Sequence, residues 1–275
     1  MKTNKVTLIT GATSGIGKAT AEALSAKGHE LIILARNADK AQDLISGLPG
    51  PAKFVECDFD KLESVEKAAG VILKETEHLD NLINNAGAIF PERMETSDGF
   101  EKHFGVNHLA PFLLTQKLMP LILKSDSKVI NVSSDAYKQA KVDFSDLQLE
   151  KSFSPIVGYA NSKLYNILFT KELAERYREH GLQTYALHPG VINSNFGDSF
   201  SGFIGLLMKV MKPFMKGIEE GAATSVMLAE AEKDHFTSGS YFKNRKPAQT
   251  KDNLVNSDFS KHIWEVSERM TTSYM

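Results

Sequence analysis

The first half of the chain alternates short apolar runs with longer segments of helical spacing. In the segments between the runs, as in residues 62–72, apolar side chains recur every three or four positions, which is typical of amphipathic helices. Strands that alternate with helices predict parallel strands joined by right-handed crossovers. Ligands of such sheets bind beyond the carboxyl ends of the strands, so we expect the functional residues just after the apolar runs. The runs lie at residues 5–10, 30–35, 53–57, 80–84 and 128–133.

A glycine-rich turn follows the first run and precedes a helical pattern from Lys18 to Lys27. Its glycines are Gly11, Gly15 and Gly17, in the spacing G-x-x-x-G-x-G. Glycine lets the backbone turn sharply and approach a ligand because it has no Cβ. The N-terminus of the following helix offers unpaired N–H donors and the positive end of its dipole to a pyrophosphate. The turn therefore predicts a nucleotide phosphate site.

The residues after the next two runs predict which groups of a dinucleotide are bound there. After the second run come Ala35 and Arg36, where an NAD site usually has an acidic residue for the ribose 2′-hydroxyl. An arginine without that acid favours the 2′-phosphate of NADP. After the third run comes Asp58. Asp58 either accepts a hydrogen bond from an adenine amino group or caps the helix that begins near Lys61.

The bulk properties narrow the class of protein. The chain has 275 residues, of which 42% are hydrophobic and 24% charged, which suits one domain over residues 1–275. A net charge of −2 gives no electrostatic footprint for nucleic acid. The one cysteine, Cys57, excludes an internal disulfide, and the eight histidines lack metal-ligand spacing, so we expect no metal. No secretory segment precedes the first run, which favours a cytoplasmic protein.

Two later segments carry chemistry. The fifth run is followed by Ser133 and Ser134, and a strongly helical segment begins near Tyr159 and Lys163. Tyr159 and Lys163 are four residues apart and so share one helix face. An ammonium beside a phenol favours the phenolate, so we expect a lowered Tyr159 pKa and proton exchange with a substrate oxygen. Taken alone, the pair is better explained as a surface contact on an amphipathic helix.

Together these motifs resemble the short-chain dehydrogenase/reductase family over nearly the whole chain. The resemblance rests on the glycine turn and on matches in the same order farther along: Asn84-Asn85-Ala86-Gly87, Asn107, the Ser133-Ser134 pair, Tyr159-x-x-x-Lys163 and Pro189-Gly190. The longer segment before Tyr159 is similar to the retinol dehydrogenase-like branch. The resemblance implies a doubly wound parallel sheet of Rossmann type, with about seven strands flanked by helices.

The resemblance also implies roles for individual residues. The catalytic set would be Asn107, Ser134, Tyr159 and Lys163, with Tyr159 as acid/base, Lys163 on the nicotinamide ribose and Ser133 as a structural residue. NADP would be the cofactor, with Ser14 and Arg36 at the 2′-phosphate. The remaining cofactor contacts would come from Gly11, Gly15, Ile16, Gly17, Asp58, Asn85, Gly87, Pro189, Gly190 and Ser194.

A run rich in Phe, Leu and Met follows Ser194. In the family this region covers the substrate, so residues 195–217 are interpreted as a lid over a hydrophobic carbonyl or alcohol. Packing on the core is the simpler interpretation of any single side chain. Another interpretation is an interfacial helix, in which residues 203–216 contact a membrane. The sequence leaves the oligomeric state open.

The resulting hypothesis is an NADP-dependent oxidoreductase. A non-catalytic NADP-binding sensor or scaffold on the same fold is the alternative, and the intact Tyr-Lys pair speaks against it. A lyase or isomerase that does not consume the cofactor is a third. Fold-level analogy names neither the substrate nor the direction of the reaction.

Overall fold

The computed structural model describes residues 5–190 and 217–275, and the strands of these residues form one sheet. They are β1 (Val6–Thr10), β2 (Glu30–Ala35), β3 (Ala52–Glu56), β4 (Asn81–Asn84), β5 (Lys128–Val132), β6 (Gln183–His188), β7 (Ser240–Lys243) and β8 (Lys246–Pro247). Their order across the sheet is β3-β2-β1-β4-β5-β6-β7-β8. Strands β1 to β7 run parallel, and only the two-residue β8 is antiparallel to its neighbour. The predicted doubly wound parallel sheet is thereby confirmed.

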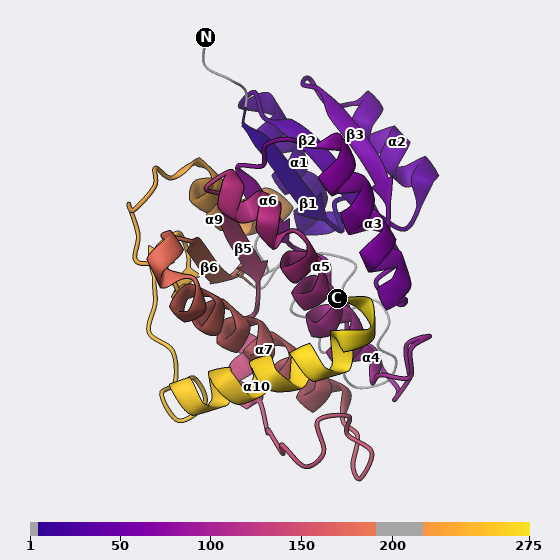
Figure 1. Cartoon of the computed structure of the whole chain (residues 1–275), viewed down its shortest axis with the longest axis vertical. Coiled ribbons are helices and arrows are strands. Elements are labelled where there is room, and N and C mark those ends of the chain that lie inside the picture. The colour runs from indigo at the N-terminus through magenta and orange to yellow at the C-terminus, as the bar shows by residue number, and fades with distance from the viewer. Residues whose placement is uncertain (1–4, 191–216) are drawn as a thin grey trace.

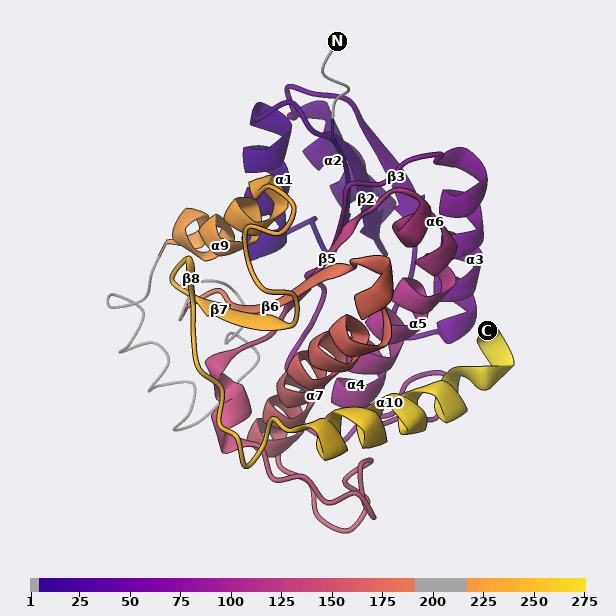
Figure 2. The same cartoon turned by 60° about the vertical axis from the view of Figure 1, so that its left-hand side comes forward.

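Helices cover both faces of the sheet (Figure 2). The longer ones are α1 (Gly15–Ala26), α2 (Ala38–Ser46), α3 (Leu62–Glu75), α5 (Ala110–Lys117), α6 (Met119–Lys124), α7 (Pro155–Arg176), α9 (Ile218–Glu230) and α10 (Ser257–Thr271). Helices α1 and α9 pack together on one face, and α3, α5 and α7 cover the other. Helix α10 lies along the outer side of α7 (Figure 1).

Alternate residues of the central strands pack into two separate cores. Leu8 of β1 belongs to the core beneath α3, α5 and α7, whereas its neighbour Ile9 belongs to the core beneath α1 and α9. The pair Val129 and Ile130 of β5 divides in the same way. Strands buried on both faces have nearly continuous apolar runs, which is why the strands could be located from the sequence.

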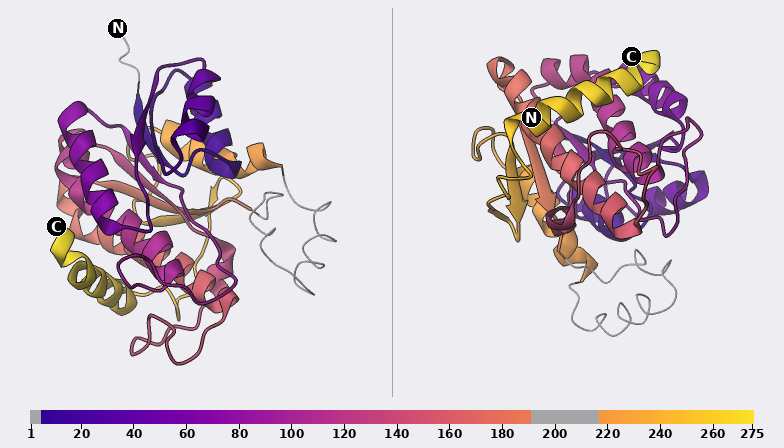
Figure 3. Two further views of the ribbon diagram at one scale, coloured as in Figure 1. Left: turned by 90° about the vertical axis from the view of Figure 1, so that its right-hand side faces the viewer. Right: turned by 90° about the horizontal axis from the view of Figure 1, so that it is seen from below.

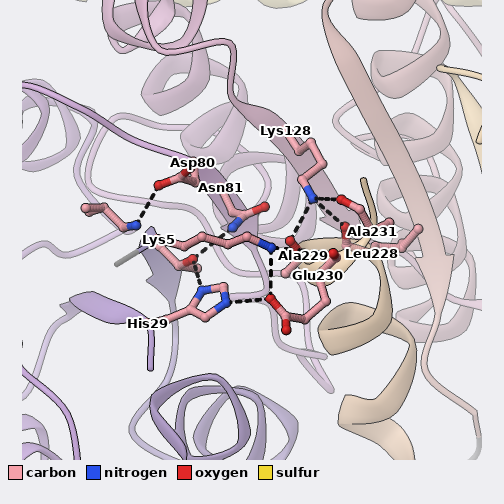
Figure 4. A network of polar contacts seen from close by, with 11 residues as sticks. Lys5, His29, Asp80, Asn81, Lys128, Leu228, Ala229, Glu230 and Ala231 are labelled. Atoms are coloured by element: carbon pink, nitrogen blue, oxygen red, sulfur yellow. Dashed lines mark hydrogen bonds and ion pairs between the residues drawn. The ribbon is translucent and has the colours of Figure 1, made fainter. Parts of the chain in front are cut away.

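Polar contacts fix α9 at the edge of the sheet where the strands begin (Figure 4). The Lys128 ammonium donates to three main-chain carbonyl oxygens at the C-terminal end of α9, those of Leu228, Ala229 and Ala231, at 3.0, 2.7 and 2.6 Å. The last carbonyls of a helix lack intrahelical donors, and a cation there also meets the negative end of the dipole. The Glu230 carboxylate accepts from Lys5 at 3.0 Å and pairs with His29 at 2.8 Å.

The chain ends beside α5 and α3 (Figure 3). There Lys117 of α5 donates to the carbonyl oxygen of Tyr274 at 2.9 Å. In residues 5–190 and 217–275, no helix is long and apolar enough to cross a membrane. The predicted lid and the 203–216 membrane contact lie outside the described residues, apart from Gly217 at the start of α9. The one-domain organisation and the cytoplasmic location stay predictions.

Candidate active site

The turn between β1 and α1 has a shape that only glycine allows. Gly11 and Gly15 have φ values of +65° and +52°, in the left-handed region. A Cβ at Gly17 would lie 2.4 Å from both the Gly11 oxygen and Asn85 Nδ2. The backbone therefore turns tightly against the end of β4. This leaves a cradle at the N-terminus of α1 that fits a dinucleotide pyrophosphate.

Asn85 holds this turn in place. Its side-chain Nδ2 donates to the main-chain oxygens of Thr10, at 2.8 Å, and Gly11, at 3.2 Å. In return, the buried Thr10 hydroxyl accepts from the backbone N–H groups of Asn85 and Ala86, at 3.0 and 2.9 Å. The structure thus engages the Asn85 side chain in shaping the turn, and its contact with a cofactor stays a prediction.

The side chains expected at a 2′-phosphate are exposed. Ser14 precedes α1 and its side chain makes no capping hydrogen bond to that helix. Arg36 follows the end of β2, where the Gly11 N–H donates to the Leu34 oxygen at 3.0 Å. The side chain of the neighbouring Asn37 caps α2 by accepting a hydrogen bond from the Lys40 N–H. The strand end that carries Arg36 is therefore joined directly to the glycine turn.

Asp58 lies after β3 and is partly exposed. Its Oδ1 accepts from the N–H of Asp60 at 3.1 Å, a contact within its own turn. Helix α3 begins at Leu62, and the Leu62 N–H donates to Asp98 at 2.8 Å. The capping role considered for Asp58 is wrong, because Asp98 from a distant loop supplies the carboxylate. The adenine contact stays a prediction.

The structure brings Ser134, Tyr159 and Lys163 together. Ser134 follows β5 and hydrogen-bonds through its side chain to that of Tyr159. Lys163 lies one turn farther along α7, and its Nζ is 5.5 Å from the centre of the Tyr159 ring. That ammonium is buried and donates to the Val132 oxygen at 3.2 Å. The other serine, Ser133, is buried and donates to the Lys163 main-chain oxygen at 2.6 Å.

The ionisation of the pair differs from the expectation. Burial raises the pKa of Tyr159 above its ordinary value, and the hydrogen bond with Ser134 opposes this only in part. Burial also lowers the pKa of Lys163 to about 8. The predicted net lowering of the Tyr159 pKa is wrong for this structure, because desolvation of the phenol dominates. At neutral pH the site therefore holds a protonated phenol beside an ammonium.

Asn107 lies in a short π-helix, η1 (Gly105–Leu109), of a kind often found at functional sites. Its fully buried amide clamps Ala88, accepting from the Ala88 N–H and donating to the Ala88 oxygen, both at 2.8 Å. A Cβ at the adjacent Gly87 would lie 3.0 Å from Lys163 Nζ and 3.4 Å from Asn107 Oδ1. Asn107 and Lys163 therefore border the same point of the chain.

The loops behind Ser134 are tied together by residues that the sequence analysis did not identify. The Asp135 carboxylate accepts from the Tyr241 hydroxyl at 3.0 Å and from Lys243 at 2.5 Å. The Asp135 N–H donates to His188 Nδ1 at 3.2 Å, which joins the ends of β5 and β6. In the sequence, the only indication that Asp135 helps to organise this site is that it directly follows Ser134.

The remaining predicted contacts come after β6. Pro189 and Gly190 follow its last residue, and Gly190 has a φ of +108°, where only glycine is unstrained. Ser194 lies outside the described residues. In the part of the chain that the structure describes, no three His, Cys, Asp or Glu side chains are grouped to hold a metal ion.

Comparison with known proteins agrees with this geometry. The family model for short chain dehydrogenase matches residues 5–201. Human retinol dehydrogenase 12 is 39% identical over 269 residues, covering 96% of this chain and 85% of that protein. Human retinol dehydrogenase 14 is 37% identical over 290 residues, covering 97% and 86%. The chain belongs to the short-chain dehydrogenase family and is retinol dehydrogenase-like.

Solved structures share the fold. An uncharacterized protein from Mycobacterium Paratuberculosis superposes with a TM-score of 0.80 and 28% identity, covering 98% of this chain and 93% of that one. NADPH-bound carbonyl reductase from chicken fatty liver superposes with a TM-score of 0.64 at 24% identity, over 86% and 95% of the two chains. By family and fold, the protein is an NAD(P)-dependent oxidoreductase.

Proposed function

We propose that the protein uses NADP to transfer a hydride between the nicotinamide and an apolar carbonyl or alcohol, with Tyr159 as the acid/base. The observation that carries the proposal is the contact of Ser134 with Tyr159 beside the buried ammonium of Lys163. A binding protein has no need of a phenol placed against a serine and a desolvated cation. The arrangement instead suits proton transfer to an oxygen atom.

In reduction, a carbonyl gains a hydride at carbon and a proton at oxygen. A nicotinamide cofactor bound at this site would supply the hydride. The Ser134 hydroxyl hydrogen-bonds the carbonyl oxygen, and Tyr159 transfers its phenolic proton to that oxygen as the alcohol forms. The raised pKa keeps Tyr159 protonated and ready to act as the acid. The Lys163 ammonium stabilises the phenolate that remains. Oxidation reverses these steps.

The cofactor site is assigned from the strand ends. The turn at Gly11, Gly15 and Gly17, with the N–H groups near Ile16, would bind the pyrophosphate. The exposed Arg36, with Ala35 in place of an acid, favours the 2′-phosphate of NADP over the free ribose of NAD. Ser14 would assist Arg36. Further contacts are assigned to Asp58, Gly87, Pro189, Gly190 and Ser194.

The substrate class follows from the relatives and from apolar side chains after β4. The names of the relatives point to retinol, an apolar alcohol. In this chain Ile89 and Phe90 are partly exposed and lie just past the point where Gly87 meets Lys163. Such side chains favour an apolar substrate over a charged one.

A turnover assay tests the proposal. The protein is mixed with NADPH and a series of straight-chain aldehydes, and the absorbance of NADPH is followed. Loss of absorbance together with alcohol formation supports the oxidoreductase. NADPH binding without turnover of any carbonyl or alcohol would indicate a sensor or scaffold. Conversion of a substrate without net consumption of NADPH would indicate a lyase or isomerase.

A further inference from the structure

A buried Glu–His pair lies beside Tyr159. Glu101 and His103 are 1% and 0% exposed, at the start of the short helix α4 (Lys102–Phe104). The Glu101 Oε1 accepts from the His103 main-chain N–H at 3.0 Å and contacts His103 Nδ1 at 2.7 Å. The Glu101 Oε2 accepts from the Phe104 N–H at 2.9 Å. The buried carboxylate is thus well supplied with donors.

The partners of His103 fix its tautomer. Its Nε2 lies 3.0 Å from the main-chain nitrogen of Phe90, which can only donate. Nε2 is therefore the acceptor, and Nδ1 carries the proton that it donates to Glu101. A neutral imidazole held in one tautomer connects the Glu101 carboxylate to the backbone of a different segment.

That segment is the chain after β4, which passes the catalytic side chains. Asn107 clamps it at Ala88, and His103 holds it two residues later at Phe90. His103 and Asn107 are four residues apart, the spacing of one helix face. The two side chains thus hold the segment at consecutive points as it leaves the catalytic centre.

His103 also packs against the element that carries Tyr159. Its ring centre is 6.5 Å from that of Tyr159, in an edge-to-face arrangement, and 5.2 Å from that of Phe90. A Cβ at Gly158 would lie 2.8 Å from His103 Nδ1, so this approach depends on a glycine next to Tyr159. The imidazole is therefore wedged between the Phe90 backbone and the start of α7.

We propose that His103, oriented by Glu101, is a positioning residue that sets the distance between Phe90 and Tyr159 and thereby the apolar wall of the substrate site. The inference rests on the proposed function, because it assigns Phe90 to the substrate site of that reaction. His103 packs edge-to-face against the Tyr159 ring but takes no part in the transfer of the proton or the hydride. Its loss weakens the binding of long apolar substrates and leaves the proton transfer by Tyr159 intact.

Two substitutions each keep one of the two hydrogen bonds of the imidazole and remove the other. In His103→Gln, the amide oxygen replaces Nε2 as acceptor for the Phe90 N–H, and the donor to Glu101 is lost. In His103→Asn, the amide nitrogen replaces Nδ1 as donor to Glu101, and the Phe90 N–H loses its partner. The first measurement is hydrogen exchange of the Phe90 amide in the whole protein, which needs no turnover. We expect protection in wild type and in His103→Gln, and faster exchange in His103→Asn.

The second measurement is the steady-state kinetics of the same proteins with hexanal and dodecanal. A partly buried N–H that loses its partner is costly, so His103→Asn should raise KM for dodecanal about tenfold. We expect little change in kcat, in KM for hexanal or in NADPH affinity. His103→Gln should resemble wild type. Equal losses in both variants, or an unchanged dodecanal KM in His103→Asn, would overturn the proposal.

If the His103 variants do not fold, a third variant tests whether Phe90 forms part of the apolar wall of the substrate site. Phe90→Ala removes the ring and keeps the main-chain N–H that His103 accepts. It should raise KM for dodecanal more than for hexanal, and an equal effect on both would overturn the assignment of Phe90. If wild type itself turns over no carbonyl, the proposed function fails, while the Phe90 exchange data still report on the clamp.

Discussion

The ammonium of Lys163 lies 5.5 Å from the centre of the Tyr159 ring, one helical turn farther along α7. Both groups are desolvated, and burial shifts each pKa toward the neutral form of its group. The phenol is therefore a stable acid at neutral pH, while the ammonium titrates within an accessible range. In the proposed mechanism, proton transfer then depends on a substrate oxygen and on stabilisation of the phenolate by the cation.

The first prediction concerns pH. Burial lowers the pKa of Lys163 to about 8, so the ammonium is lost as the pH rises through that value. The kcat/KM for aldehyde reduction should fall by about tenfold per pH unit above about 8, because it reports ionisation in the free enzyme. In Lys163→Arg the positive charge persists at all accessible pH values, so the residual activity of this variant should not show this decrease at high pH. A wild-type profile that stays flat to pH 10 would contradict the role of the cation.

The second prediction concerns cofactor choice. Arg36 is exposed at the end of β2 and has no acidic neighbour at Ala35. Charge-assisted hydrogen bonds to a phosphate contribute about 1.5–3 kcal/mol, so Arg36→Ala should weaken NADPH binding about tenfold or more. The affinity for NADH should change little, and Ala35→Asp combined with Arg36→Ala should favour NADH. Titration of each protein with both cofactors measures this, and equal wild-type affinities would refute it.

The third prediction compares two glycines. A Cβ at Gly17 would lie 2.4 Å from the Gly11 oxygen, whereas a Cβ at Gly70, within α3, meets nothing within 4 Å in the described residues. Gly17→Ala should therefore abolish cofactor binding or destabilise the fold by more than about 1 kcal/mol. Gly70→Ala should stabilise it by roughly 0.5–1 kcal/mol, because alanine is the better helix former. Urea unfolding and NADPH titration of both variants test this, and similar behaviour would show that the turn can relax.

The fourth prediction concerns stability against pH. Burial opposes the ionisation of Glu230, but hydrogen bonds from His29 and Lys5 outweigh it and lower the pKa to about 2. A carboxyl whose pKa is lowered in the folded state stabilises the protein at pH values above the ordinary pKa of the carboxyl, here 4.5. This contribution is lost as the pH falls toward 2. Glu230→Gln should therefore cost about 1 kcal/mol near neutral pH, after allowance for solvent screening.

The difference between Glu230→Gln and wild type should shrink as the pH falls to 3. The exposed Glu77 provides a control, since Glu77→Gln should change the free energy of unfolding little at either pH. Urea unfolding at pH 7 and pH 3 gives the four comparisons. A difference for Glu230→Gln that is the same at both pH values would show that its charge is not what stabilises α9.

The fold could be predicted from the sequence because its strands are buried on both faces. Residues such as Leu8 and Ile9 face opposite cores, so apolar residues stand at consecutive positions of the run. The contacts that fix α9 could not be predicted in this way. Lys128 and Glu230 are about a hundred residues apart in sequence and act on one helix end only after the sheet has formed.

The side chains proposed for catalysis could be predicted as types, but their surroundings could not. Tyr159 and Lys163 share a helix face by spacing alone, and the resemblance placed Ser134 in the same catalytic set. Burial reverses the expected direction of the Tyr159 pKa, and no sequence pattern measures desolvation. The positioning role proposed for His103 could not be predicted, because it depends on the backbone N–H of Phe90, which carries no sequence signature.

Tyr159→Phe gives the most direct test of the central claim that Tyr159 is the acid/base of an NADP-dependent carbonyl reduction. The substitution removes only the hydroxyl, and the measurement is single-turnover oxidation of bound NADPH by dodecanal, with the NADPH affinity determined on the same samples. The account predicts a rate reduced by about 10²–10⁴-fold, because a positioned general acid is lost, with NADPH affinity nearly unchanged. A Tyr159→Phe protein that oxidises NADPH within a few-fold of the wild-type rate would contradict it.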